Sequence, residues 1–424
     1  MILKENVGFG SADILLPDFS RVDGTLWSVV ACDQYTSEPS YWEKAERMVD
    51  GAPSTLRLIL PEVWLSQTEE RLPLIHEAMQ SYLKTVLVEH PDAMIYLERT
   101  QSDGRVRRGI VGAMDLDCYD YHKGATSLIR ATEGTVLERI PPRVRIRRGA
   151  PVELPHAMLL IDDPQRNVIE PLLAKTEELE LVYDFDLMLG GGHVRGFLLD
   201  KAEQTRILQE LSTLITPNAM QERYGDSSLA PLLFAMGDGN HSLASAKAAY
   251  EEIKTQIGEE AAARHPARYA LAEIVNLHDE ALQFEPIYRV VFGCDPCELL
   301  DELKQYVAEL QGDAETQRMV CVLEGVEEIV TVAHPEQQLT VGTLQSFLDR
   351  YQKAHPEVEV DYIHGEKSLR ALANRKDAIG FLFDGMRKDE LFRTVIYDGA
   401  LPRKTFSMGH APDKRYYLEC RRIR

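Results

Sequence analysis

One segment constrains the fold of this chain more than any other. An apolar run, Leu232–Met236, leads directly into the glycine-rich turn Gly237-Asp238-Gly239 and then into a helical pattern. The apolar residues after the turn recur at helical spacing on one face: Leu243, Ala246, Tyr250 and Ile253. Backbone N–H groups at such a strand-to-helix junction, together with the helix dipole, favour a phosphate or a carboxylate. The segment therefore predicts an anion-binding turn within an α/β fold.

The polar side chains of this turn suggest chemistry. Asp238 is a candidate ligand for a divalent cation such as Mg²⁺, and His241 a candidate to shuttle a proton or to donate to a phosphoryl oxygen. The remaining candidates for binding phosphate at the turn are Gly237, Gly239, Asn240 and Ser242. The same sequence also suits an ordinary turn in which Asn240 or Asp238 caps the helix.

The chain is too long for one ordinary core. At 424 residues it predicts two to three domains. Strands are expected at Leu56–Leu60 and at Met158–Ile161, and strands alternate with helices again after Asp295. We expect a mixed α/β (α+β) fold, in which residues 1–290 form an N-terminal lobe that carries the turn and residues 291–424 form a smaller C-terminal α/β lobe.

Charge and cysteine usage restrict the partners and the compartment. With 47 Lys+Arg against 68 Asp+Glu the balance is 47 − 68 = −21, which disfavours nucleic acid and anionic membranes as partners. The six cysteines are scattered, and the sequence has neither an apolar leader nor a long apolar run. We expect a cytoplasmic protein that binds small molecules; the sequence does not decide its oligomeric state.

A basic stripe interrupts the acidic sequence. Arg143, Arg145 and Arg147 alternate with Val144 and Ile146. If this segment is a strand, the three guanidinium groups share one face. The stripe is then either an anion site or a strand edge protected by charge.

Three further groups each have two interpretations. The Cys294–Cys297 pair has redox spacing, but a helix start explains it as well. A glycine turn is flanked by Asp184, Asp186 and His193. These three residues are either metal ligands or only polar neighbours of the turn. The loop Asp33–Tyr35 follows the end of a strand. Its residues either line a pocket or form an exposed polar loop.

Several segments match the pattern of a known family. Its central motif, usually Asp-Gly-His-His-Arg, stands here as Asp238-Gly239-Asn240-His241-Ser242. Thr55–Pro61 matches as well, and Glu285–Val291 stands where the family tends to have Pro-Thr-His-Arg. Gly399–Thr405 stands where the family tends to have Met-Pro-Gln-Lys-Ser. Arg130–Thr135 stands where it usually has His-Glu-x-Thr. On these residues, nearly the whole chain resembles the bacterial and archaeal family called domain of unknown function 1015.

The central motif is in turn similar to that of the ParB and sulfiredoxin superfamily, which includes a free-serine kinase. There a Gly-x-His-Arg turn at a helix start holds nucleotide phosphates. The resemblance implies a ParB/sulfiredoxin-like catalytic lobe that binds ATP or ADP with Mg²⁺. It makes Glu133 a candidate general base or metal ligand, although a capping role at the surface explains this residue equally well. In this chain Ser242 replaces the arginine and Asn240 one histidine. The candidates for the missing cation are Arg289, Lys404 and the arginines of 143–147.

Three functions are consistent with this sequence. The first is a nucleotide-dependent phosphotransferase acting on a small hydroxylated metabolite such as an amino acid. The second is a regulatory protein that binds a nucleotide or another anion at the same turn without turnover. The third is a partition-protein-like scaffold that binds nucleic acid, and the net charge of −21 argues against it.

Overall fold

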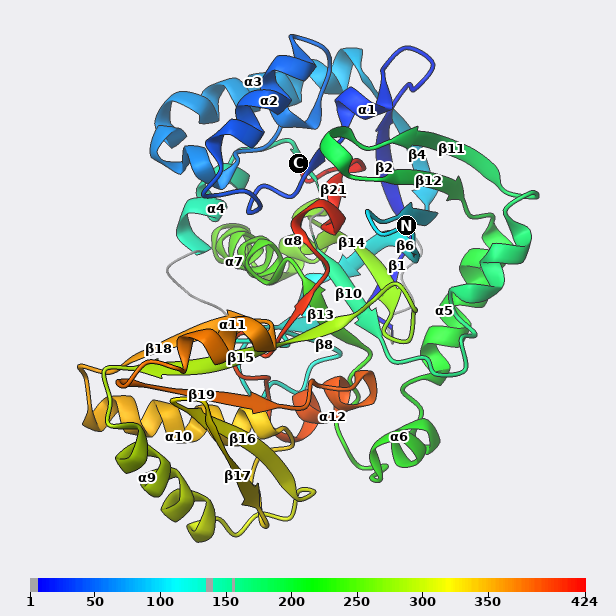
Figure 1. The fold of residues 1–424 in the computed structure, drawn as a ribbon. Helices are drawn as coiled ribbons and strands as arrows, with labels where there is room; N and C mark the ends of the chain where they lie inside the picture. The colour runs from blue at the N-terminus through cyan, green and yellow to red at the C-terminus, as the bar shows by residue number, and fades with distance from the viewer. Residues whose placement is uncertain (1–6, 135–139, 155–156) are drawn as a thin grey trace. The chain divides into compact units, whose positions relative to one another are not determined.

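The computed structural model describes residues 7–134, 140–154 and 157–424. It is a mixed α/β protein, as expected, and its chain divides into two compact units (Figure 1). Unit 1 comprises Met1–Ala131, Thr135–Leu282 and Gly409–Arg424, and unit 2 comprises Thr132–Gly134 and Gln283–Met408. The boundary expected between residues 290 and 291 falls inside strand β15 (Phe284–Phe292), and the end of the chain returns to unit 1.

A ten-stranded sheet forms the centre of unit 1. Its order is β11-β12-β5-β6-β14-β10-β13-β8-β7, with β1 paired to β6. Strand β10 runs parallel to β14, and β8 runs parallel to both β13 and β7. The strands are β1 (Phe9–Gly10), β5 (Ile95–Thr100), β6 (Val106–Asp115), β7 (Tyr119–Asp120), β8 (Ile129–Arg130), β10 (Met158–Ile161), β11 (Glu180–Asp186), β12 (His193–Leu198), β13 (Phe234–Asp238) and β14 (Tyr269–Asn276).

Both faces of this sheet are buried, because successive side chains of a strand point to opposite faces. In β5, Ile95 and Leu97 join one core and Tyr96 joins the other. The core that contains Tyr96 is covered by α5 (Lys201–Thr213) and α7 (Asn240–Ile257). The other core contains residues of α2 (Pro39–Val49), α3 (Thr68–Thr85) and the small sheets β4-β2-β22-β9 and β21-β3. The strands of these small sheets are β2 (Ala12–Pro17), β3 (Val29–Val30), β4 (Leu87–Ala93), β9 (Val152–Glu153), β21 (Tyr416–Tyr417) and β22 (Cys420–Arg422). The remaining helices of unit 1 are α1 (Gly24–Trp27), α4 (Ile140–Arg147), α6 (Pro217–Tyr224) and α8 (Glu259–Ala262).

Local capping explains one wrong prediction. The strand expected at Leu56–Leu60 is instead a short 3-10 helix, Thr55–Arg57, followed by coil. Ser54 Oγ accepts the N–H of Leu56, and Thr55 Oγ1 donates to the carbonyl of Trp27 at 2.8 Å. The apolar residues of this segment are buried in the core, as those of a strand would be, which explains the wrong prediction. In the described structure they pair with no strand.

Unit 2 is a smaller α/β sheet, and the alternation predicted after Asp295 is confirmed in it. The sheet order is β17-β16-β19-β15-β18, with β20 paired to β15. Helix α11 packs on Val290 and Leu382 on one face, while α10 covers the other face (Figure 1). The elements are α9 (Pro296–Glu309), β16 (Gln317–Leu323), β17 (Val326–Val332), α10 (Thr340–Ala354), β18 (Glu359–His364), α11 (Glu366–Leu372), β19 (Ala378–Phe383), α12 (Lys388–Tyr397) and β20 (Phe406–Met408).

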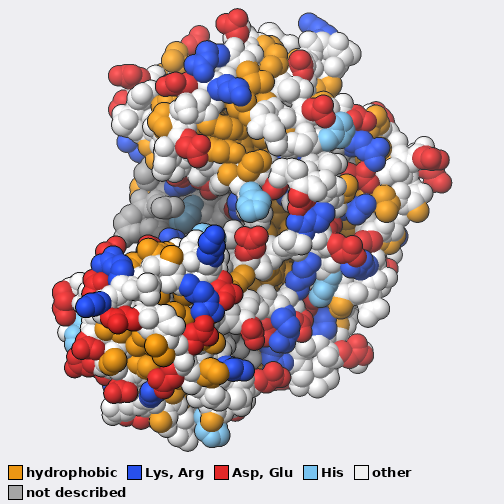
Figure 2. All heavy atoms as spheres, viewed as in Figure 1, with side chains coloured by type: hydrophobic (Ala, Val, Ile, Leu, Met, Phe, Trp, Pro, Cys, Tyr) orange, Lys and Arg blue, Asp and Glu red, His pale blue; other side chains and the backbone are white. Residues whose placement is uncertain are grey.

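The surface mixes both signs of charge. On the face drawn in Figure 2, Lys and Arg side chains are interspersed with Asp and Glu instead of forming one basic patch. In the described part of the chain, no helix has both the length and the apolarity of a membrane span.

Candidate functional site

The predicted strand-turn-helix is confirmed. Strand β13 buries Phe234, Ala235 and Met236 and reaches the edge of the core at Asp238, which lies opposite Met158 of β10. Gly239 has a φ of +81°, in the left-handed region that favours glycine, and α7 begins at the next residue. The chain turns here because the apolar face of α7 packs back onto the core that contains β13.

The N-terminus of α7 has no side-chain cap among the described residues. Asp238 Oδ1 accepts the N–H of Gly239 at 2.9 Å, so this carboxylate is not the cap of the helix. Asn240 is not the cap either: its Oδ1 is buried and has no hydrogen-bond partner in the described structure. The first backbone bond of the helix runs from the Leu243 N–H to the Gly239 carbonyl at 3.0 Å. A helix start without a side-chain cap is suited to an anion.

The other two polar residues of the motif lie in the first turn of α7. His241 and Ser242 are both half-buried, as are Gly237, Asp238 and Asn240. The His241 carbonyl accepts a hydrogen bond from Ser245 Oγ at 2.6 Å. The structure thus brings the central candidates together at one partly open turn.

Replacing Gly239 tests how strictly this turn is built. Gly239→Ala forces a side chain into the left-handed region, which costs roughly 1–2 kcal/mol. We expect the free energy of unfolding of unit 1 to fall by about that amount, measured by urea denaturation. Gly225→Ala is a matched control for stability, since Gly225 has a φ of +84° and ends α6, away from the turn. Both variants should lose similar stability, and only Gly239→Ala should also alter anion binding.

A lysine that the sequence analysis did not select lies at the turn. Lys414 Nζ is 3.5 Å from Asp238 Oδ2, and the two side chains are 21% and 16% exposed. Lys414 belongs to the C-terminal segment that returns to unit 1. Motif matching could not find it, because only the return of the chain after β20 brings it to the turn.

The basic stripe is part of a helix, so the condition for three guanidinium groups on one strand face is not met. Residues 140–147 form the helix α4, in which Ile140 and Val144 pack on Ala244 and Ala249 of α7. Each guanidinium is paired with a carboxylate: Arg143 with Glu62, Arg145 with Glu69 and Arg147 with Glu153. These arginines are therefore engaged within unit 1 and do not form one basic face.

The other proposed cations and Glu133 belong to unit 2. Arg289 is fully buried and donates to the carbonyls of Arg403 and Lys404 at 2.9 Å each, and burial lowers its pKa to about 10. Lys404 Nζ lies 4.7 Å from the ring centroid of Tyr362. Glu133 is half-buried and forms a backbone bridge with Leu401. Arg289 supports the segment 403–404, so its geometry does not favour phosphate binding.

Among the described residues, Asp238 is not part of a cluster of metal-ligating side chains. Within the described ranges, no group of three or more His, Cys, Asp or Glu residues is placed to hold an ion. Both oxygens of Asp238 are engaged, one with the Gly239 N–H and the other with Lys414. His193 lies between Asp184 and Asp186, with a hydrogen bond of 2.7 Å to each in the hairpin.

The Cys294–Cys297 pair is explained by a helix start. Asp295 caps α9 by accepting the N–H of Cys297 at 2.9 Å. Burial raises the pKa of Cys294 to about 11, which keeps its thiol protonated at neutral pH. The structural interpretation of this spacing therefore holds.

Sequence reasoning also missed a polar network at the far end of β10. Asp162 follows β10 and His278 follows the parallel strand β14, so the two residues meet at one sheet edge. His278 Nε2 lies 2.7 Å from Asp162 Oδ1, and the Tyr224 hydroxyl donates to Asp162 Oδ2 at 2.6 Å. Burial alone would raise the pKa of Asp162, but His278, Tyr224 and Arg223 lower it. The sequence signal that could have indicated this network is that Asp162 and His278 each follow an apolar run.

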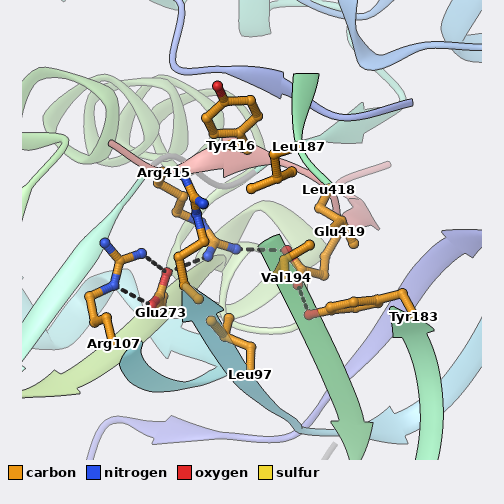
Figure 3. A pocket seen from close by; sticks show the side chains of 11 residues that line it. Leu97, Arg107, Tyr183, Leu187, Val194, Glu273, Arg415, Tyr416, Leu418 and Glu419 are labelled. Carbon is orange, nitrogen blue, oxygen red and sulfur yellow. Dashed lines mark hydrogen bonds and ion pairs between the residues drawn. The ribbon is translucent and has the colours of Figure 1, made fainter. Parts of the chain in front are cut away.

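A second missed feature is a buried charged network beside a small cavity of unit 1 (Figure 3). Glu273 is fully buried and accepts from Arg107 at 3.3 Å and from Arg415 at 2.5 Å. Arg415 also pairs with Glu419 at 2.7 Å, and Glu419 accepts the Tyr183 hydroxyl at 2.8 Å. The network fixes the C-terminal segment immediately after Lys414.

Several solved structures are similar to this chain, including the following three. A conserved hypothetical protein from Pyrococcus furiosus shares 12% identity, with a TM-score of 0.33 over 70% of this chain and 90% of that one. A free serine kinase in complex with AMP shares 12%, with a TM-score of 0.36 over 73% and 90%. SbnI with a C-terminal truncation, from Staphylococcus aureus, shares 9%, with a TM-score of 0.34 over 70% and 82%.

The sequence itself gives the assignment to a family. No curated protein matches the chain. The family described as "Protein of unknown function (DUF1015)" matches residues 18–351, which include the turn and most of both units. This chain belongs to that family.

Proposed function

We propose that this protein is a nucleotide-dependent phosphotransferase that acts on a small hydroxylated metabolite such as an amino acid. In this proposal the phosphates of ATP or ADP bind at the turn between β13 and α7. One observation carries the proposal: α7 starts at a left-handed glycine, has no side-chain cap among the described residues, and presents half-buried polar side chains in its first turn. The five residues 238–242 also resemble the family's central motif, from which Asn240 and Ser242 depart.

The proposed reaction uses groups of this turn. The acceptor hydroxyl oxygen attacks the terminal phosphorus, the bond from phosphorus to the nucleotide oxygen breaks, and the hydroxyl proton passes to a base. Backbone N–H groups and the helix dipole stabilise the charge on the phosphoryl oxygens. His241 is the candidate to take the proton or to donate to a phosphoryl oxygen.

Nucleotide binding is the first expected result. ADP is expected to stabilise unit 1, whose unfolding is reported by Trp27, Trp42 and Trp64, all of which lie in this unit. At a concentration of 100 times Kd the stabilisation is about 2.7 kcal/mol. Adenosine, which has no phosphate, should stabilise far less. The absence of a thermal shift with every nucleotide tested would refute the proposal.

Product formation separates an enzyme from a regulatory protein. The chain is incubated with ATP or ADP and a panel of hydroxy amino acids, and phosphorylated products are detected by mass spectrometry. Binding without any product would favour a non-catalytic nucleotide-binding regulator. The replacement of the motif arginine by Ser242 and of one histidine by Asn240 is the observation that favours this second function.

A further inference from the structure

We propose that Lys414 supplies the positive charge that binds phosphate at the β13–α7 turn, and that Asp238 holds this lysine in place while the turn is empty. The inference rests on the proposed function and identifies a binding residue outside the family motif. It also accounts for the loss of the motif arginine at Ser242, because a cation from the C-terminal segment takes its place.

The pairing of Lys414 with Asp238 places a cation at the start of α7. Asp238 ends β13, and its Oδ1 accepts the N–H of Gly239, which fixes the carboxylate at the turn. Lys414 Nζ is 3.5 Å from the other oxygen, longer than the usual 2.7–2.9 Å of a charge-assisted hydrogen bond. Both side chains are partly open to solvent, so exchanging this partner for a phosphate costs little.

The backbone that presents Lys414 is fixed on both sides. Asp413 is buried and accepts the N–H of Ser102 at 2.7 Å and its hydroxyl at 3.0 Å. Arg415 is buried in the charged network of Figure 3, where it pairs with Glu273 and Glu419. The backbone on both sides of Lys414 is therefore held in place, so directing its charge at the turn costs little backbone entropy.

Electrostatics require such a cation. The proposed anion would lie beside the Asp238 carboxylate, and two like charges in a partly buried site repel each other. The nearby arginines of α4 are each paired with a carboxylate, and Lys247 of α7 pairs with Glu251 at 2.7 Å. Lys414, in contrast, forms an ion pair with a residue of the turn itself.

Isothermal titration of the full chain with ADP and with inorganic pyrophosphate tests the proposal. Lys414→Met is expected to weaken both ligands about tenfold or more, since one charge-assisted hydrogen bond is lost. Lys414→Arg keeps the charge and should stay within about threefold of the wild type. Lys201→Met is the matched control: it removes one lysine paired with an aspartate, because Lys201 at the start of α5 pairs with Asp92 of β4. It should bind ADP like the wild type.

A substitution of the partner gives the opposite sign. Asp238→Asn retains an oxygen for the Gly239 N–H but removes the carboxylate charge that competes with phosphate for Lys414, so we expect pyrophosphate to bind about twofold to tenfold more tightly. In the Lys414→Met background the same change should have a smaller effect, because no lysine remains for which the carboxylate and the phosphate compete.

The outcomes separate this inference from the proposed function. If wild-type protein binds neither ADP nor pyrophosphate, both are overturned. If wild type binds and Lys414→Met binds equally well, or if the effect of Asp238→Asn is the same in both backgrounds, Lys414 is not the phosphate cation and the proposed function stands without it.

Discussion

His241→Ala is expected to lower the rate of phosphoryl transfer by about 10²- to 10⁴-fold, the usual contribution of a positioned proton-transfer group. His241 lies half-buried in the first turn of α7, three residues after Asp238. The proposed function makes its ring the partner of a phosphoryl oxygen or of the acceptor hydroxyl. The helix itself should survive, because its packing depends on Leu243, Ala246 and Tyr250. The measurement is the initial rate of product formation at saturating nucleotide.

A control separates chemistry from folding. His122→Ala removes a histidine that is 73% exposed and paired with Asp120, and should leave the rate unchanged. Tryptophan fluorescence should show the same unfolding temperature for wild type and His241→Ala, within a few degrees. A His241→Ala enzyme with the wild-type rate would remove His241 from the mechanism, and a parallel loss of ADP affinity would assign it to binding instead.

The turn was predictable because local pattern and tertiary packing agree there. An apolar strand, two glycines and apolar side chains at helical spacing leave few alternatives, and the structure places β13, Gly239 and α7 accordingly. The strand at Met158–Ile161 and the alternation in unit 2 were predictable for the same reason.

The basic stripe shows that alternation over a few residues is not enough to predict a strand. Five residues of alternating Arg and apolar type suit a strand, but Ile140 and Val144 also share a helix face at a spacing of four. Packing on Ala244 and Ala249 selects the helix, and the three arginines then pair with separate carboxylates. The sequence alone could not show that this face of α4 packs against α7.

Lys414 and Glu273 could not be found by motif or by periodicity. The segment 409–424 leaves the sheet of unit 2 after β20 and pairs through β21 and β22 with strands from the beginning of the chain. Pairing between segments so far apart in the sequence leaves no local signal. A lysine flanked by Asp413 and Arg415 reads as ordinary surface charge until the buried partners of those two neighbours are known.

Glu273→Gln is expected to lower the free energy of unfolding of unit 1 by about 3–5 kcal/mol, the cost of removing one partner from a buried ion-pair network. Glu273 is fully buried between Arg107 and Arg415, and both arginines are also buried (Figure 3). A neutral amide leaves their charges without the carboxylate that offsets desolvation. The measurement is urea denaturation followed by tryptophan fluorescence, which reports on unit 1.

The pH dependence of this loss has a defined sign. Burial alone would raise the pKa of Glu273, but the guanidiniums of Arg107 and Arg415 outweigh burial and lower it from its ordinary value of 4.5. The carboxylate therefore stabilises the fold fully above about pH 4.5, and its contribution is lost as the pH falls through the lower folded value. The gap between wild type and Glu273→Gln should narrow in acid. Glu252→Gln, in an exposed pair with Arg148, should cost at most about 1 kcal/mol, and an equal loss in both variants would show that burial does not govern the effect.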